Sequence, residues 1–451
     1  MRLITIAGTW AAAALLLTAC NGGAGPAALP AAGPLRPDRA SSGKIQHVVI
    51  IVQENRSFDN LFYGAPGADT ATYGYDSTGK KIVLKPVSLK TRWDLDHSSY
   101  SFFEACNGTG SYPGTNCQMN GFNLEQVECG IPGYPPCPNK NPPYSYVPHA
   151  EIKPYFEMAK QYVLADKMFS SNFDASSFVS HQYIIAGQAS SSVDYPDYQW
   201  GCDGGSADFI ATVTKQRRVP GRKEVVCFDN KTIGDELDQA GRSWAYYTAA
   251  YGDGSFWSAY DAIRQIREGP DWDKDVITPP SRFFDDVKQG KLRDVTWITP
   301  TCKNSDHAGC DSNHGPYWVA SLVNAIGESK YWKSTAIFVF WDDYGGWYDH
   351  VAPKLVDYDG LGFRLPLLVI SPYAKKGYVS HVHYEHGSLL RFVEDQFGLA
   401  RLSASDARAK SPEEDCFDFS RPPRTFVPIQ SKLDADYFLH EPPDNRAPDS
   451  Q

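Results

Sequence analysis

Two stretches of the chain are unbroken runs of apolar residues that stop abruptly near acidic ones. The first run covers 48–52 and is soon followed by Glu54, and the second covers 336–341 and is followed at once by Asp342 and Asp343. Apolar runs of strand length are typical of strands that are buried on both faces, as in parallel sheets. Further candidate strands lie at 162–165, 244–248, 295–299 and 365–370.

Segments with helical patterns of apolar residues lie between these runs, at 151–161, 178–186, 232–240, 317–326 and 387–397. Strands that alternate with helices predict an α/β fold. We expect a three-layer sandwich with a mostly parallel central sheet, whose crossover helices cover both faces. The predicted domain covers 44–402.

Two parts of the chain depart from this alternation. Residues 65–148 are crowded with Gly, Pro, Asn and Tyr and hold two cysteine pairs, which predicts a loop-rich, disulfide-stapled insertion able to cover a cleft. Its aromatic residues could form an apolar approach to a site or simply pack the loops. Residues 403–451 are rich in Pro and Asp, so we expect a tail that packs on the domain or is partly frayed.

The N-terminus has the features of an export signal. Arg2 precedes a long apolar segment that ends in Leu17-Thr18-Ala19-Cys20, which resembles the lipobox of bacterial lipoproteins. We expect 1–19 to be a lipoprotein signal peptide, Cys20 to carry the lipid, and 20–43 to be a flexible tether. The mature protein would then be exported and anchored in a membrane, facing the periplasm or the cell exterior. An ordinary signal peptide and a short membrane anchor are the alternatives.

Charge and cysteine content narrow the class of protein. The net charge is −10 and no basic run occurs, so we do not expect the protein to bind nucleic acid. Eight of the nine cysteines other than Cys20 fall into pairs at short spacing, which suits an exported chain with four local disulfides and a free Cys416. The simplest pairing joins Cys106 with Cys117, Cys129 with Cys137, Cys202 with Cys227, and Cys302 with Cys310. Because no C-x-x-C pair occurs, a zinc ribbon is disfavoured.

Residues suited to phosphate-ester hydrolysis occur in four separate segments. Carboxylates at the carboxyl ends of parallel strands can converge on one hard cation, which prefers oxygen ligands. A hydroxyl at a helix N-terminus lies at the positive end of the helix dipole, where an alkoxide or a phosphate is stabilised. Each segment alone has an ordinary explanation, such as a helix cap or a turn, so the joint occurrence carries the weight. The segments are Glu54-Asn55, Ser176-Ser177, Asp306-His307, and Asp342-Asp343 with Asp349-His350.

Several motifs resemble those of the bacterial phosphoesterase family that contains non-specific phospholipases C and related acid phosphatases. ENRSFDNLF at 54–62 resembles the opening motif of that family, and DDYGGWYDHV at 342–351 resembles its D-[DE]-x-G-G-x-x-D-H-V motif. Segments that look like further family motifs lie at 96–98, 305–307, 362–366, 370–372 and 386–392. Together the matches span 45–400 in the order of the family.

The resemblance implies an alkaline-phosphatase-like fold and one divalent metal ion. The oxygen-rich ligand set favours calcium or magnesium, and iron, manganese and zinc are the alternatives. Asn55 would contact the phosphate. The metal would be held by Glu54, Asp342, Asp343 and the hydroxyl of the nucleophile. Three histidines would surround the phosphoryl oxygens, one of them protonating the leaving group: His97, His307 and His350. The role of Asp349 stays open between orienting His350 and supporting the loop.

The nucleophile segment departs from the family pattern. The family has Thr or Ser at the start of T-x-P-N-[RH], whereas this chain reads SFVSH at 177–181 and lacks the proline. Ser177 aligns with the nucleophile, Ser176 is the runner-up, and His181 takes the basic position of the motif.

The expected activity is metal-dependent hydrolysis of phosphate esters through a covalent phosphoserine. The substrate would be a phospholipid diester, as for a phospholipase C, or a phosphomonoester, as for an acid phosphatase. A sulfatase is disfavoured because none of the candidate site segments carries the C/S-x-P-x-R signature. The alternative from another class is a non-catalytic, surface-anchored binding lipoprotein.

Overall fold

A computed structural model of the chain describes residues 43–198, 201–249, 257–444 and 446. The predicted signal peptide, Cys20 and all but the last residue of the predicted tether lie outside the described residues. None of the described helices has the length and apolar character needed to span a bilayer.

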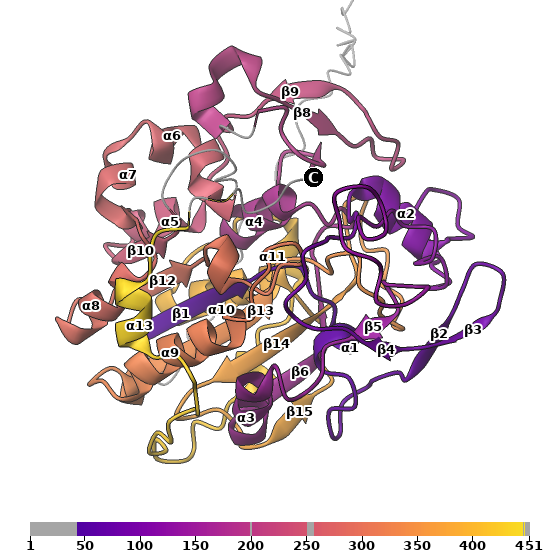
Figure 1. Cartoon of the computed structure of the whole chain (residues 1–451). Helices are drawn as coiled ribbons and strands as arrows, with labels where there is room; N and C mark the ends of the chain where they lie inside the picture. The colour runs from indigo at the N-terminus through magenta and orange to yellow at the C-terminus, as the bar shows by residue number, and fades with distance from the viewer. Residues whose placement is uncertain (1–42, 199–200, 250–256, 445, 447–451) are drawn as a thin grey trace, which may run out of the picture. The chain divides into compact units, whose positions relative to one another are not determined.

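A nine-stranded mixed sheet forms the centre of the fold (Figure 1). All neighbouring strands run parallel except β14, which is antiparallel to both β13 and β6. In spatial order the strands are β11 (Val276–Ile277), β10 (Trp244–Tyr247), β12 (Val295–Ile298), β1 (His47–Gln53), β13 (Thr335–Trp341), β14 (Arg364–Ile370), β6 (Val163–Phe169) and β15 (Tyr378–Ser380), and β16 (Tyr384–Glu385) also pairs with β6. The predicted, mostly parallel α/β sheet is therefore confirmed.

The direction of β14 has a local cause. The segment 342–363, which joins β13 to β14, contains no helix. Parallel neighbours need a crossover connection, usually a helix, whereas a strand that returns directly pairs antiparallel. The strand predicted at 365–370 thus exists, but it reverses the direction of the sheet.

Each of the five predicted helices is present, at α3 (Lys153–Gln161), α4 (Ser177–Ala186), α5 (Ile233–Gln239), α9 (Gly315–Gly327) and α10 (His386–Phe397). The other α-helices are α1 (Phe58–Leu61), α2 (Ser99–Cys106), α6 (Arg264–Arg267), α7 (Pro270–Asp275), α8 (Arg282–Lys288), α11 (Ala404–Arg408), α12 (Glu413–Cys416) and α13 (Ala435–His440). Most of these additional helices are short, which is why their periodicity gave no clear signal in the sequence.

Helices cover both faces of the sheet, as the alternation of side chains along β13 shows. Phe338 and Phe340, two residues apart, contact Phe392 and His386 of α10. Trp341, which projects to the opposite face, packs edge-on against Tyr155 of α3. Because both faces are covered, every residue of β13 is buried, and the apolar run needs no polar alternation.

The region 65–148 is the loop-rich insertion that the sequence predicts. Two disulfides close it, Cys106–Cys117 and Cys129–Cys137. Its regular elements are α2 and the short strands β2 (Tyr73–Tyr75), β3 (Lys81–Val83), β4 (Lys85–Pro86) and β5 (Ser145–Tyr146). Phe102 and Phe103 pack against Phe173, which supports the interpretation of these aromatics as loop packing.

The remaining cysteines and the tail also have defined places. Cys202–Cys227 and Cys302–Cys310 complete the four predicted disulfides, and Cys416 is free and buried. The first of these lies beside a small sheet of β7 (Ser192–Val193), β8 (Phe209–Thr212) and β9 (Lys223–Val225). In the tail, Phe438 of α13 packs against Phe284 and Trp318, so this part of the tail packs on the domain.

Candidate active site

The register of β1 and β13 brings two acidic residues together. Gln53 pairs with Trp341 at the carboxyl ends of these parallel strands, so the next residues, Glu54 and Asp342, are neighbours as well. Successive residues of a strand project to opposite faces of the sheet. Glu54 and Asp342 therefore lie on the face opposite Trp341, which is the face that α10 covers.

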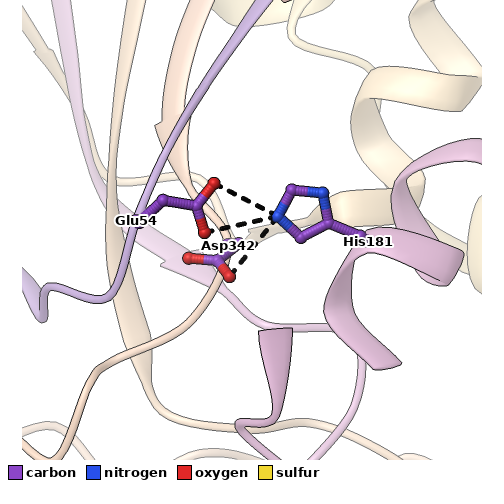
Figure 2. Close-up of side chains that lie close together, drawn as sticks. All are labelled: Glu54, His181 and Asp342. Carbon is purple, nitrogen blue, oxygen red and sulfur yellow. Dashed lines mark hydrogen bonds and ion pairs between the residues drawn. The ribbon is translucent and has the colours of Figure 1, made fainter. Parts of the chain in front are cut away.

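Helix α4 adds a histidine to these two carboxylates. Nε2 of His181 lies 3.3 Å from each carboxylate oxygen of Glu54 and 3.6 Å from Oδ2 of Asp342. Figure 2 shows the ring edge directed at both carboxylates. Ligand atoms of the three residues, one from each, lie within 4.8 Å of one another. Glu54, His181 and Asp342 are hereafter called the three-ligand group.

The chemistry of this group fits a divalent cation. All three side chains are fully buried. Burial lowers the pKa of His181 to about 4, although the charge of Asp342 acts in the opposite direction, so the imidazole is neutral at neutral pH. Oδ2 of Asp342 accepts no hydrogen bond from the described residues. Buried carboxylates are costly without a compensating charge, and carboxylates with a neutral imidazole are common metal ligands.

Ser177 begins α4 and contacts two other predicted site residues. Its Oγ lies 3.4 Å from Nδ2 of Asn55 and 3.4 Å from Oδ2 of Asp343. The hydroxyl of Ser176, the alternative nucleophile, instead donates to the carbonyl of Asp194 at 2.8 Å. Of the two adjacent serines, Ser177 is therefore the one whose hydroxyl lies within the predicted site. Asp343 contacts this serine and is not a member of the three-ligand group.

A tight turn fixes Asn55 and Asp343 beside each other. Asn55 adopts a left-handed φ of 60°, and its backbone N–H donates to Oδ1 of Asp342 at 3.0 Å. Gly345 has a φ of 59° and donates its N–H to Oδ1 of Asp343 at 2.7 Å. A Cβ on Gly345 would lie 2.2 Å from the carbonyl oxygen of Asn55, so only glycine allows this approach.

His97 belongs to the insertion and contacts Asn55, which in turn contacts Ser177. Its Nδ1 lies 2.7 Å from the carbonyl of Leu95, so this nitrogen carries the proton. Its Nε2 then accepts from Nδ2 of Asn55 at 2.9 Å and from the hydroxyl of Tyr195 at 3.3 Å. The ring of His307 lies beside it, with 6.1 Å between ring centroids.

His307 has a carboxylate behind its ring. Its Nδ1 contacts the carbonyl of Ala308 and lies 3.7 Å from Oδ2 of Asp94. The ring also packs beside Trp257 at 5.6 Å between centroids. A carboxylate at this distance stabilises the protonated imidazole. The structure thus brings His97 and His307 together near Asn55.

His350 has different partners from those that the resemblance implies. Its Nδ1 lies 2.6 Å from Oδ2 of Asp59, and its Nε2 lies 3.0 Å from Oδ1 of Asp69. Asp349 accepts from both the backbone N–H of Asp59 and Nε of Arg364. Asp59 therefore orients His350, and Asp349 supports the loop, which answers the question that the sequence left open.

This second acidic group differs from the three-ligand group in its charge. Asp59, Asp349 and His350 also place ligand atoms within 4.8 Å of one another. However, the buried guanidinium of Arg364 contacts Asp349 at 3.0 Å and Asp59 at 3.3 Å. A cation of the protein thus already offsets these carboxylates, and the contacts of His350 support a structural role. Its role as a phosphate contact stays a prediction.

Sequence reasoning missed or undervalued three residues. Tyr195 and Asp94 lie in loops with no recognisable motif. His181 follows Ser177 by four residues, which places both on one face of a helix, and this spacing was the available signal. The family motif gives this histidine only a basic position, whereas in the structure it faces two carboxylates.

The carboxyl edge of this α/β sheet therefore collects carboxylates, a hydroxyl, an amide and imidazoles, a combination that is typical of hydrolases. The chain belongs to the Phosphoesterase family, whose model matches residues 45–400. It is accordingly a hydrolase that acts on phosphoric ester bonds. The family that the motifs predict is confirmed.

Two bacterial phospholipases C match most of this chain at low sequence identity. The non-hemolytic phospholipase C of Burkholderia pseudomallei is 26% identical over 414 residues, which cover 78% of this chain and 55% of that protein. Phospholipase C B of Mycobacterium tuberculosis is 25% identical over 436 residues, which cover 85% of this chain and 80% of that protein. The chain thus spans about half the length of the first relative and most of the second.

Among solved structures, a protein of the alkaline phosphatase superfamily from Vibrio parahaemolyticus matches with a TM-score of 0.35 and 11% identity. The match covers 82% of this chain and 72% of that chain. The α/β fold class of the present protein rests on its own strand order and helix layers.

Proposed function

We propose that the protein hydrolyses phosphodiesters of phospholipids in the manner of a phospholipase C, with Ser177 as the nucleophile. The observation that carries this proposal is the position of the Ser177 hydroxyl. It lies at the start of α4, within 3.4 Å of both Asn55 and Asp343, and four residues from a member of the three-ligand group. Family membership sets aside the non-catalytic alternative.

The first chemical step forms a covalent phosphoserine. Oγ of Ser177 attacks phosphorus, the new O–P bond forms, and the bond from phosphorus to the alcohol oxygen breaks. Oδ2 of Asp343, which lies 3.4 Å from Oγ, is placed to take the proton of the hydroxyl. Water then attacks phosphorus, the new O–P bond forms, and the Oγ–P bond breaks to release the phosphate product. Asp343 returns the proton to Oγ of Ser177, and the proton lost by water passes to the group that protonated the leaving alcohol.

Groups around Ser177 are suited to the negative charge that develops on the phosphoryl oxygens. The amide of Asn55 donates from Nδ2 and is itself held by Nε2 of His97. The N-terminus of the ten-residue α4 presents its first backbone N–H groups and the positive end of the helix dipole at the same place. Fixed donors of this kind stabilise an anionic transition state without reorganisation.

A divalent metal ion belongs to this proposal because the buried carboxylates fit one. Glu54 and Asp342 would hold it, and the predicted contributions of Asp343 and Ser177 stay predictions. Such an ion would supply positive charge that lowers the pKa of the serine hydroxyl and neutralises phosphoryl oxygens. Calcium and magnesium are the ions that oxygen ligands alone favour.

His307 is the proposed donor of the proton to the leaving alcohol. Its Nδ1 faces the carbonyl of Ala308 and Asp94, and Nε2 is the nitrogen that we propose exchanges a proton with substrate. Protonation of the leaving oxygen matters most when the alcohol is a poor leaving group, as diacylglycerol is.

The substrate class rests on the relatives, since both of those named above are phospholipases C. A phosphomonoester, as for an acid phosphatase, is the second outcome of the test. Purified protein should hydrolyse p-nitrophenylphosphorylcholine faster than p-nitrophenyl phosphate, and exhaustive chelation should abolish turnover of both. The opposite preference would make the protein a phosphatase.

Replacement of the nucleophile gives the direct test of mechanism. Ser177→Ala should lower kcat by at least about 10⁴-fold without unfolding the protein, because it removes the attacking atom. Ser176→Ala is the matched control, and it should retain most activity because its hydroxyl bonds Asp194. Burst kinetics and mass spectrometry of acid-quenched protein would identify the phosphoserine. Turnover by Ser177→Ala at the wild-type rate would refute the assignment.

The same proposal places the mature protein at a membrane through a lipid on Cys20. The support is the sequence Leu17-Thr18-Ala19-Cys20 after an apolar segment and the Ala-, Gly- and Pro-rich stretch that follows it.

A further inference from the structure

We propose that His181 is a ligand of the metal ion, so that the site prefers a transition metal such as Zn²⁺ or Fe²⁺ over Ca²⁺ and Mg²⁺. This inference shares one premise with the proposed function, namely that a metal ion binds beside Ser177. It replaces the oxygen-only ligand set that the sequence implies with a mixed set of nitrogen and oxygen.

The first support is the direction of the imidazole. Nε2 of His181 faces both carboxylates, 3.3 Å from both oxygens of Glu54 and 3.6 Å from Oδ2 of Asp342 (Figure 2). These separations between ligand atoms are of the size found when several ligands surround one ion at about 2 Å each. An all-oxygen site would not need a nitrogen directed at both carboxylates.

The second support is the rigidity of the elements that carry these ligands. Glu54 and Asp342 follow paired positions of two buried parallel strands. His181 lies inside α4, all of whose residues are buried. Ser177 lies one turn before His181 on the same helix face, so binding of an ion by His181 would also fix the position of the nucleophile.

The third support is ligand chemistry. Ca²⁺ and Mg²⁺ are hard ions that select oxygen, whereas imidazole suits Zn²⁺, Fe²⁺ and similar ions. The competing interpretation is that a protonated His181 forms an ion pair with the carboxylates and that no metal ligand is needed there. In that case an arginine at 181 would serve equally well.

Metal binding is the readout that separates these interpretations, because it does not depend on turnover. The full chain, stripped of metal with a chelator, would be titrated with Zn²⁺, Mn²⁺, Ca²⁺ and Mg²⁺ by isothermal titration calorimetry. Bound Co²⁺ would report nitrogen ligation through its visible absorption. We expect wild-type protein to bind Zn²⁺ at least about 100-fold more tightly than Ca²⁺.

His181→Gln should weaken Zn²⁺ binding by at least about 100-fold and change the Co²⁺ spectrum. The matched control is His381→Gln, since His381 also faces a carboxylate, Asp166 at 2.9 Å, but has a 57% exposed side chain outside the three-ligand group. The control should bind Zn²⁺ as the wild type does. The rise in Tm on adding Zn²⁺ gives a second measurement, and it should be lost in His181→Gln even if that variant is less stable.

Two results would overturn the inference: unchanged Zn²⁺ affinity in His181→Gln, or wild-type Zn²⁺ affinity in His181→Arg, which would support the ion pair. If Zn²⁺ binds as expected but no phosphate ester is hydrolysed, the proposed function fails and the ligand assignment stands. If esters are hydrolysed while His181→Gln leaves metal binding unchanged, the ligand assignment fails alone.

Discussion

At the residue scale, chemically similar side chains have different roles because they contact different groups. Ser176 and Ser177 are chemically identical, but one hydroxyl bonds a backbone carbonyl and the other contacts Asn55 and Asp343. His307 is buried and His350 is partly exposed, and both face carboxylates, yet only His307 lies beside His97. Contacts of single residues therefore separate the catalytic assignments from the structural ones.

The role of His307 predicts a dependence on the leaving group. His307→Gln should lower kcat by about 10²–10³-fold for a phospholipid, whose alcohol leaves poorly without a proton. The loss should be much smaller for p-nitrophenylphosphorylcholine, because nitrophenolate is stable as an anion. Comparison of kcat for the two substrates measures this, with His381→Gln as the control. Equal losses on both substrates would argue against proton donation by His307.

The surroundings of His350 predict a pH dependence of stability. Burial lowers the pKa of His350, but the hydrogen bond and charge of Asp59 outweigh burial and raise it to about 9. Because the folded pKa exceeds the ordinary value near 6.5, the stabilisation is fully present below about pH 6.5 and is lost as pH rises toward 9. The difference in free energy of unfolding between wild type and His350→Gln should shrink over this range.

Urea denaturation at pH 6, 7.5 and 9 would measure that difference. A structural role also predicts that His350→Gln lowers activity no more than its loss of folded protein does. A large fall in kcat with unchanged stability would restore the predicted phosphate contact.

At the element scale, the turn after β13 sets the geometry of the site. A left-handed conformation costs an L-residue about 1–2 kcal/mol. Gly345→Ala should destabilise the fold by more than this, because the new Cβ would lie 2.2 Å from the carbonyl oxygen of Asn55. Displacement of Asn55 should also lower kcat by about 100-fold.

Gly64→Ala is the matched control for that substitution. Gly64 has a similar φ of 69°, but a Cβ there would meet no atom within 4 Å. It should show only the conformational cost and keep wild-type activity. Chemical denaturation and steady-state kinetics on both variants test the prediction, and equal effects of the two substitutions would contradict it.

At the scale of the whole molecule, the predicted lipid anchor and the folded domain should be separable. Cys20→Ser should move the protein from the membrane fraction to the soluble fraction, because the lipidated residue is lost. Its kcat on a soluble ester should not change, since the site is built entirely from residues between 54 and 343. Fractionation of cells and phase separation in detergent would measure the change, and unchanged membrane association would refute the lipid anchor.

Much of this fold could be predicted because its signals are local. The apolar runs at 48–52 and 336–341 give strands, since strands covered on both faces carry no polar residues. Short spacings between cysteines gave all four disulfide pairs. The reversed direction of β14 was not predictable, because direction depends on where the connection 342–363 returns to the sheet.

The α/β class, the family and the acidic residues that follow β1 and β13 can all be read from the amino-acid sequence. Apolar patterning, cysteine spacing and motif order are properties of the chain that need no coordinates. Which of these residues lie in contact depends on how the chain folds in three dimensions. The register of β1 with β13 joins Glu54 to Asp342, the packing of α4 brings His181 to both, and Arg364 occupies the second acidic group. These encounters join residues that are distant in the chain, and the free energy of packing, not local pattern, fixes such contacts.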